Sequence, residues 1–234
     1  MRADDPDVYR VEGVPPLPAD PETVLELLSG RVTPRRLERM RRVVASRSRH
    51  LVPVLDRFVD PHNVSAVLRS AEAFGLLEVH AVPGPNGLPA AHRVSRGTHR
   101  WLEVHRHADP LACVRRLRER GYRIVVASMD GRLRPAQLAE LGPVAVVFGS
   151  EHAGIDPAVR AAADDTYAIA MRGFVESLNV SVAAAITFHA VAEGGLPALP
   201  EDEQRALLAR YLLASVRGGE DLVRRHVAAR EGSQ

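Results

Sequence analysis

Apolar and polar positions follow two different periods along the chain, and the changes of period divide it into short strands and helices. Apolar runs bounded by turn residues predict strands, and these lie at residues 51–55, 78–82, 101–105, 122–128, 144–148 and 166–171. Stretches with apolar residues at helical spacing alternate with them, at residues 63–74, 110–120 and 135–141 and from residues 156 and 180 onward. This alternation predicts an α/β domain with a largely parallel sheet.

The segments on either side of this alternation have a different character. The first 20 residues are rich in Pro and Asp without an apolar period, which is typical of a flexible tail, and a short helix is predicted at residues 21–28. Thr33 and Pro34 suit the N-cap and first turn of a further helix. Helical stretches at residues 204–216 and 221–230 follow a Pro-containing linker. We therefore expect four parts: a flexible N-terminal tail (1–32), a basic helix (33–50), the α/β domain (51–195) and C-terminal helices (196–234).

Charge is unevenly distributed along the chain. The formal net charge is only +2, but residues 1–30 carry seven acidic side chains against two arginines, whereas residues 31–49 carry eight arginines against Glu38 alone. Such a basic block favours a polyanionic partner. Two interpretations of the helix stay open, a solvated amphipathic face or a face that contacts RNA phosphates. The arginines expected to meet RNA are Arg35, Arg36, Arg39, Arg41 and Arg42.

Several classes of chemistry are excluded by composition. All 31 basic residues are arginine, so a Walker P-loop, a pyridoxal Schiff base and a kinase strand lysine are absent. Cys113 is the only cysteine and falls in a helical pattern, which indicates an inert core thiol, no intrachain disulfide and no cysteine-based zinc site. We expect no metal. No segment has the length of a membrane span or the layout of a signal peptide, so a cytoplasmic protein without a membrane partner is expected.

The first of three informative stretches reads N-x-x-A-x-x-R-x-A-x-x-F-G from Asn63 to Gly75. Its apolar residues form one inward stripe at helical spacing, namely Val64, Val67, Leu68, Ala71 and Phe74. Arg69 points away from that stripe, as an ordinary surface arginine does, and Asn63 is a candidate N-cap. Taken alone, this stretch is an amphipathic helix.

The second and third stretches follow predicted strands. Residues 148–154 read F-G-x-E-x-x-G, a glycine-flanked turn that holds Glu151 and His152. The carboxyl ends of parallel strands are where α/β proteins bind ligands, although a single turn of this kind is a weak signal. Residues 176–185 read E-S-L-N-V-S-V-A-A-A, in which Asn179 is placed to cap a buried helix. Free amides at such a helix N-terminus attract polar or anionic ligands.

Taken together, in this order and spacing, the three stretches resemble the three motifs of the SpoU/TrmH-type ribose 2′-O-methyltransferases of the SPOUT superfamily. The resemblance covers about residues 33–193, and the arginine-rich helix and short C-terminal helices further resemble its tRNA branch, which methylates the D-loop guanosine at tRNA position 18. The resemblance implies a sheet whose C-terminal part forms a deep trefoil knot, S-adenosylmethionine bound in that knot, and a homodimer formed across the site. The expected partner is tRNA, with no DNA.

The resemblance also implies roles for individual residues. Asn63 and Arg69 match the pair that handles the target ribose and its phosphate, and Glu151 matches the motif-two carboxylate. The remaining matches are the motif-three polar pair, Ser177 and Asn179, and the cofactor contacts, Ser128, Gly149, Ile169 and Leu178. Guanidinium groups stay protonated in proteins, so Arg69 is expected to grip phosphate and polarise the 2′-oxygen unless the site removes its charge. Whether Arg69 or Glu151 accepts the proton stays open. Ala170 departs from the family, which usually has proline there.

Three other functions compete with this one. An rRNA ribose 2′-O-methyltransferase of the same family is the nearest alternative, but only about 50 residues precede the α/β domain, which favours tRNA because many rRNA-type relatives carry a larger domain there. A non-catalytic RNA-binding relative would not need the full set of polar motif residues. A nucleotide-binding oxidoreductase is excluded, since no G-x-G-x-x-G follows the first strand.

Overall fold

The computed structural model describes residues 8–11, 13–83, 97–150 and 153–231. They divide between two compact units. The first unit comprises Met1–Val11 and Ser48–Pro197 and holds the β-sheet, whereas the second comprises Glu12–Arg47 and Ala198–Gln234 and is helical. Residues 12–47 and residues 198–234, which the sequence pattern treats separately, therefore belong to one unit.

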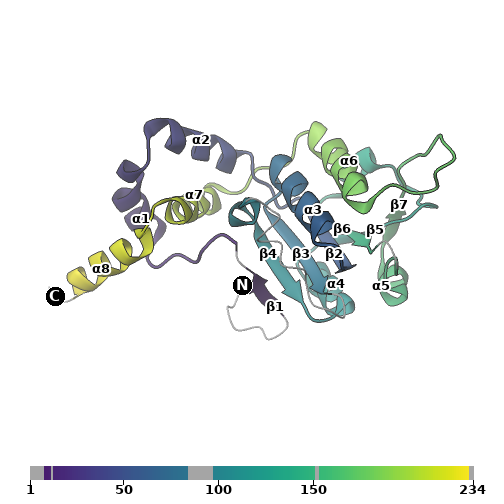
Figure 1. Ribbon diagram of the computed structural model, residues 1–234, viewed down its shortest axis with the longest axis horizontal. Helices are drawn as coiled ribbons and strands as arrows, with labels where there is room; N and C mark the ends of the chain where they lie inside the picture. The colour runs from purple at the N-terminus through teal and green to yellow at the C-terminus, as the bar shows by residue number, and fades with distance from the viewer. Residues whose placement is uncertain (1–7, 12, 84–96, 151–152, 232–234) are drawn as a thin grey trace. The chain divides into compact units, whose positions relative to one another are not determined.

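The first unit is built on a seven-stranded sheet with the order β1-β4-β3-β2-β6-β5-β7 (Figure 1). The strands are β1 (Val8–Val11), β2 (Leu51–Phe58), β3 (Glu78–Pro83), β4 (Glu103–His107), β5 (Arg123–Ala127), β6 (Val144–Gly149) and β7 (Asp165–Tyr167). Strands β2 to β7 pair in parallel, and only β1 is antiparallel, at the edge beside β4. The prediction of a largely parallel α/β sheet is confirmed. Strand β1 lies in the stretch for which no regular element was predicted.

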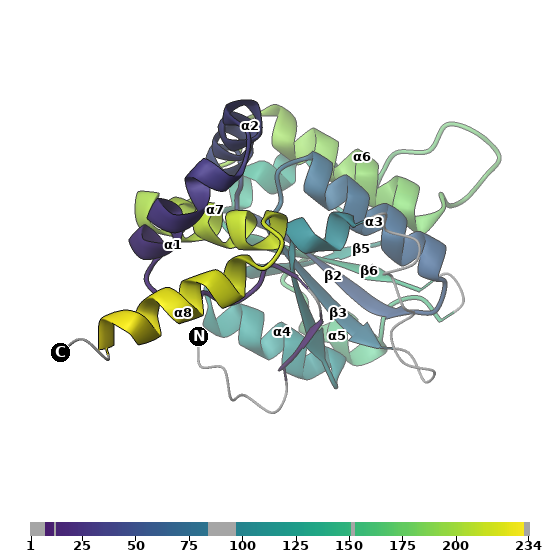
Figure 2. The same ribbon diagram turned by 60° about the vertical axis from the view of Figure 1, so that its left-hand side comes forward.

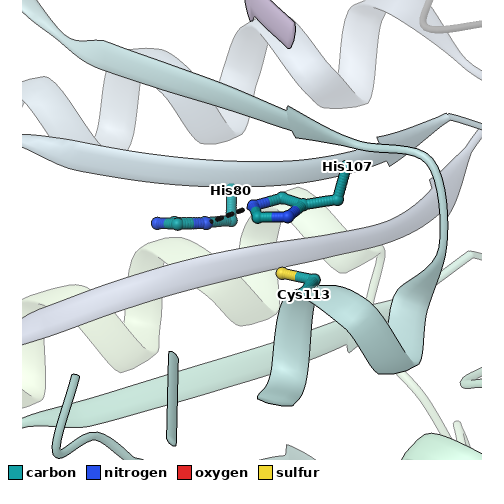
Figure 3. A group of neighbouring side chains, drawn as sticks. All are labelled: His80, His107 and Cys113. Atoms are coloured by element: carbon teal, nitrogen blue, oxygen red, sulfur yellow. Dashed lines mark hydrogen bonds between the residues drawn. The ribbon is translucent and has the colours of Figure 1, made fainter. Parts of the chain in front are cut away.

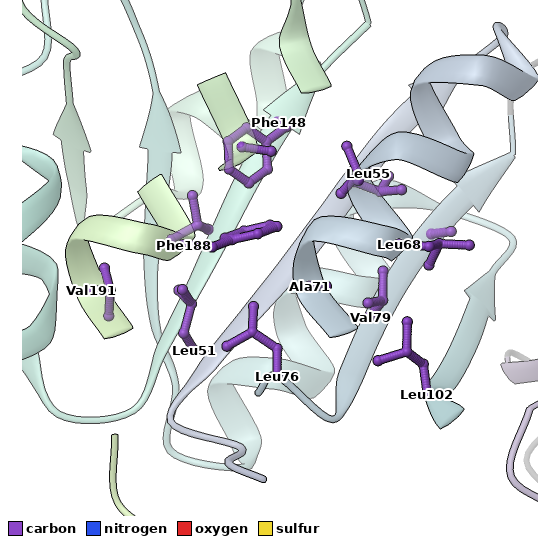
Figure 4. Packing of buried hydrophobic residues seen from close by; sticks show 14 of the residues in the cluster. Leu51, Leu55, Leu68, Ala71, Leu76, Val79, Leu102, Phe148, Phe188 and Val191 are labelled. Carbon is purple, nitrogen blue, oxygen red and sulfur yellow. The ribbon is translucent and has the colours of Figure 1, made fainter. Parts of the chain in front are cut away.

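Helices cover both faces of this sheet (Figure 2). Helices α3 (Pro61–Ala73) and α6 (Val180–Glu193) pack side by side on one face, together with the 3-10 helix η4 (Pro135–Leu141). Helices α4 (Pro110–Glu119) and α5 (Pro157–Ala162) lie on the other face. Successive residues of a strand point to opposite faces, so Leu51 joins the core under α3 and α6 and Val52 the core under α4. Figure 4 shows the first core, in which Phe148 and Phe188 meet edge to face.

Several predicted strands are wrong in their bounds: the strand predicted at residues 51–55 extends to Phe58, and two others are displaced or shortened. The strand predicted at residues 101–105 is β4, Glu103–His107, because a 3-10 helix η3 at Thr98–Trp101 precedes it. The strand predicted at residues 166–171 pairs only over Asp165–Tyr167 and leaves the sheet there. Ile169 therefore lies on a connection that follows the strand rather than within it.

The second unit is a group of helices: α1 (Pro21–Leu28), the 3-10 helix η1 (Ser29–Arg31), α2 (Pro34–Ala45), α7 (Glu201–Ser215) and α8 (Gly219–Glu231). The predicted cap of α2 is confirmed, since the hydroxyl of Thr33 accepts from the backbone N–H of Arg36 at 3.3 Å. Helix α7 packs against both α1 and α2. At the end of α2 the buried Arg47 donates from Nε to the hydroxyl of Tyr211 at 3.1 Å. No helix among the residues described here combines the length and apolar character that crossing a membrane requires.

Candidate active site

The carboxyl ends of neighbouring strands bring most of the predicted cofactor residues to one edge of the sheet. Gly149 is the last residue of β6, Ser128 directly follows β5, and Ile169 follows β7 by two residues. These three strands are adjacent and parallel, so their carboxyl ends share an edge. Leu178 and Asn179 come at the end of the loop from β7 and directly precede α6. An edge of this kind is the usual ligand site of an open α/β sheet.

The motif-two turn folds tightly back onto the end of β6. Ser150 and Gly154 exchange two backbone hydrogen bonds, of 3.1 and 2.9 Å, and Gly154 has a φ of 65°. A Cβ at Gly149 would stand 2.3 Å from the carbonyl carbon of Gly154, so only glycine fits at this position. Glu151 and His152 lie outside the described residues, so the role of the Glu151 carboxylate stays a prediction.

An aspartate that the sequence motifs did not reveal anchors this turn. Asp56, near the end of β2, pairs in register with Gly149 and is 1% exposed. Its Oδ2 accepts from the backbone N–H of Asp156 at 2.8 Å, where the turn enters α5, and its Oδ1 accepts from Nε of Arg57 at 3.1 Å. Arg57 also reaches Asp156 Oδ2 at 3.3 Å and has a φ of 54°, which is rare for a non-glycine residue. An acidic residue directly after the strand predicted at residues 51–55 was the only sequence signal for this network.

A second close backbone contact forms between the chain after β5 and strand β7. The backbone N–H of Leu133 donates to Thr166 at 3.0 Å, and that of Ala168 donates to Leu133 at 2.9 Å. A Cβ at Gly131 would lie 2.0 Å from the carbonyl carbon of Tyr167. The backbone N–H of Ser128 also donates to Tyr167, at 3.0 Å. The chain after β5 and the end of β7, more than thirty residues apart in sequence, are thus hydrogen-bonded to each other at the edge that carries the predicted cofactor residues.

The first and third motifs meet through two asparagines. Asn179 Nδ2 donates to Asn63 Oδ1 at 3.1 Å, across 116 residues of sequence. Asn179 also caps α6, since its Oδ1 accepts from the backbone N–H of Ser181 at 2.9 Å, as the sequence predicted. The alternative that Asn63 caps α3 is wrong, because the cap is Asp60. Asn63 lies instead in the first turn of α3, 7% exposed, where it faces the start of α6.

The remaining predicted residues are open to solvent. Arg69 is exposed on α3, as its position opposite the apolar stripe predicted, and Ser177 is exposed on the loop before α6. In the second unit the five predicted RNA-contacting arginines, Arg35, Arg36, Arg39, Arg41 and Arg42, are all exposed on α2. Arg36 Nη2 donates to Ser215 Oγ at 3.2 Å. Exposure is compatible with contact to a macromolecular substrate and leaves the assigned roles as predictions.

The parallel sheet, the glycine turns at its carboxyl edge and the bonded asparagines between two helix N-termini define an α/β protein with a candidate ligand site at that edge. The chain belongs to the SpoU rRNA Methylase family, whose model matches residues 50–189. The resemblance inferred from the three motifs is thereby confirmed.

Individual relatives agree with this assignment. The chain is 37% identical to a tRNA (guanosine(18)-2'-O)-methyltransferase of Thermus thermophilus over 155 residues, which is 66% of this chain and 80% of that protein. The Aquifex aeolicus TrmH/SpoU tRNA modifying enzyme superposes with a TM-score of 0.68 at 27% identity, over 78% of this chain and 98% of that one. The SpoU methyltransferase AviRb from Streptomyces viridochromogenes, solved in complex with AdoMet, has the same fold, with a TM-score of 0.57 at 24% identity over 64% of this chain and 62% of that one.

Proposed function

We propose that this protein is an S-adenosylmethionine-dependent RNA ribose 2′-O-methyltransferase that methylates the guanosine at position 18 of tRNA. The observation that carries the proposal is the hydrogen bond between Asn63 and Asn179, which joins the first and third motifs beside the carboxyl edge of the sheet. A surface amphipathic helix and an ordinary helix cap would not need that bond. It gives both asparagines a fixed orientation, as residues that position a reacting hydroxyl require.

The residues at the edge of the sheet fit the cofactor. The close backbone approaches at Gly149 and Gly131 leave no room for side chains and present main-chain groups to a nucleoside. Ser128, Gly149, Ile169 and Leu178 would hold the cofactor, with the apolar side chains of Ile169 and Leu178 against its base. When bound, S-adenosylmethionine supplies an electrophilic methyl group on a positively charged sulfur. Replacing the half-buried Leu178 by Glu should abolish cofactor binding and leave the sheet folded.

The chain's polar residues would act on the ribose. A 2′-hydroxyl is a weak acid, so transfer needs an oxygen that is oriented in line with the methyl group and loses its proton as the new bond forms. Asn63 and Asn179 orient the ribose, and the exposed guanidinium of Arg69 grips the adjacent phosphate and polarises the 2′-oxygen. Ser177 contributes a hydroxyl from the preceding loop. Glu151 either holds Arg69 or accepts the proton.

The finer features of the fold belong to the same proposal. In the family's trefoil knot the C-terminal chain passes through a loop. The hydrogen bonds of Leu133 with Thr166 and Ala168 hold the chain after β5 against β7, and this contact supports a knot here. A homodimer is supported by apolar side chains that are exposed around the site on the loop and on α6, namely Phe174, Val175, Val182 and Ile186. A cytoplasmic location follows from a tRNA substrate.

The arginine-rich helix α2 would bind the RNA backbone, and tRNA rather than rRNA is the expected substrate. The decisive experiment incubates the full-length protein with labelled S-adenosylmethionine and separate pools of unmodified tRNA and rRNA, then maps the methylated nucleotide. We expect label in tRNA alone, as 2′-O-methylguanosine at position 18. Label in rRNA alone would assign the protein to the rRNA branch of the family. Label in neither pool would overturn the proposed activity.

A further inference from the structure

A second group of reactive side chains is buried between strands β3 and β4 and helix α4. Glu78 and His80 lie on β3, His105 and His107 on β4, and all four point to the face that α4 covers. Together with Cys113 of α4, each is at most 3% exposed. The proposed methyl transfer uses none of these residues, and a buried group of this kind needs a physical reason to exist.

Glu78 sets the charge and the hydrogen bonding of this group. Its Oε2 accepts from Arg49 at 2.7 Å and from Arg120 at 2.9 Å. Burial alone would raise the pKa of Glu78, but the hydrogen bonds from Arg120 and His80 hold it well below its usual value. Glu78 is therefore an anion and can only accept hydrogen bonds.

The tautomer of His80 follows from this contact. His80 Nε2 lies 2.7 Å from Glu78 Oε1, so this ring nitrogen carries the proton and the opposite nitrogen, Nδ1, presents a lone pair. That lone pair faces His107 Nε2 at 2.6 Å, beside the thiol of Cys113 (Figure 3). The candidate ligand atoms of His80, His107 and Cys113 all lie within 4.8 Å of one another.

We propose that His80, His107 and Cys113 bind a zinc-class divalent metal ion that fastens α4 to strands β3 and β4. Two imidazoles and one thiolate are three ligands of the kinds that zinc binds, and a water would take the fourth tetrahedral position. A metal-bound histidine usually donates its other ring N–H to a carboxylate, as His80 does to Glu78. Zinc–nitrogen bonds of about 2.0–2.1 Å place two nitrogens on one tetrahedral zinc roughly 3.3 Å apart. His80 Nδ1 and His107 Nε2 are now 2.6 Å apart, so an ion would require the two rings to separate by less than about 1 Å.

The Cys113 thiol keeps its proton until an ion displaces it. Burial, and then the nearby carboxylates of Asp56, Glu78 and Asp109, raise the pKa of the Cys113 thiol. The ion would bind as the thiol releases one proton and the ring proton of His107 moves from Nε2 to Nδ1, without a change of oxidation state. The sequence predicted no metal because Cys113 stands alone, but strand pairing supplies the two imidazoles that a single thiolate needs.

A neighbouring set of groups is a weaker candidate and serves as the control. Glu78, His80 and His105 also lie close together, but two arginines already neutralise Glu78 and would repel a cation there. Within the described part of the chain, His105 Nε2 has no hydrogen-bond partner, and His105 is as buried as His107 two residues away. Replacing His105 therefore perturbs the same core and leaves all three proposed ligands in place.

The test adds Co²⁺ and Zn²⁺ to the full-length protein after chelator treatment. Because Cys113 is the chain's only cysteine, a thiolate-to-cobalt charge-transfer band in the wild type reports its ligation without any mutation. We expect one equivalent of Co²⁺ with that band, displacement by Zn²⁺ and a higher melting temperature with either ion. Cys113→Ala should lose the band, His107→Ala should weaken binding at least about tenfold, and His105→Gln should bind as the wild type does. A cobalt complex without the sulfur band, or a wild type that binds neither ion, would overturn the proposal.

Discussion

The glycine at the end of β6 gives the sharpest test of how the cofactor edge is built. In Gly149→Ala the new methyl carbon would stand 2.3 Å from the carbonyl carbon of Gly154 and 2.5 Å from the backbone nitrogen of Ile155. Both are backbone atoms that cannot rotate away, so the motif-two turn has to open. The two hydrogen bonds between Ser150 and Gly154 would be lost or lengthened, at about 1 kcal/mol each. Overpacking of this kind costs about 1–3 kcal/mol in total.

The expected result is a folded but weaker protein that has lost its cofactor site. For a chain of this length, about 1–3 kcal/mol corresponds to a melting temperature lower by roughly 2–12 °C. Strand β6 keeps its pairing with β2 and β5, so the sheet survives while the affinity for S-adenosylmethionine falls at least about tenfold. Thermal unfolding and calorimetric titration of the same preparation measure both quantities.

The matched control is Gly194→Ala at the end of α6. No atom lies within 4 Å of a Cβ built there, and its φ of −76° suits any residue. This variant should melt and bind cofactor as the wild type does. If Gly149→Ala also melts within about 0.5 kcal/mol of wild type and keeps its affinity, the close approach of Gly149 and Gly154 does not shape the site.

Three further predictions concern the motif residues and the basic helix. Because its side chain is exposed, Arg69→Ala should change the free energy of unfolding by less than about 0.5 kcal/mol and keep cofactor binding. The same variant should lower the rate of methyl transfer at least about a hundredfold. Near-normal turnover would show that Arg69 is a surface residue only. Asn63→Ala and Asn179→Ala should show a coupling energy of about 1 kcal/mol in a double-mutant cycle of urea unfolding, and additive effects would contradict the bond between them. Changing Arg35, Arg39 and Arg42 to Gln should reduce the steepness of the plot of log binding constant for tRNA against log salt concentration by about 2–3. The affinity for S-adenosylmethionine should stay unchanged. An unaltered slope would indicate that this face of α2 contacts solvent and not RNA.

The sequence predicted the alternation of strands and helices because each element buries one face, and burial leaves a period in the residue pattern. It also predicted the cap at Asn179 and the exposure of Arg69, since both depend on local spacing. The contact between Asn63 and Asn179 was not predictable from spacing, because it depends on how α3 and α6 pack across the sheet.

Other features depended on strand register, which the sequence pattern did not fix. A strand placed at residues 101–105 leaves His107 outside the sheet, whereas β4 at Glu103–His107 puts His105 opposite His80 and continues to His107 on the same face. The buried group around Cys113 therefore became visible only in the structure. Asp56 was missed for a related reason: its partner, the backbone N–H of Asp156, lies 100 residues away.

Methyl transfer to one ribose hydroxyl is tested most directly by a tRNA that lacks that hydroxyl. The measurement compares methyl incorporation into two tRNAs of identical sequence, one of which carries 2′-deoxyguanosine at position 18. We expect one methyl group per molecule of the unmodified tRNA and none in the deoxy substrate. Equal incorporation into both would contradict it, because the acceptor would then be a different atom.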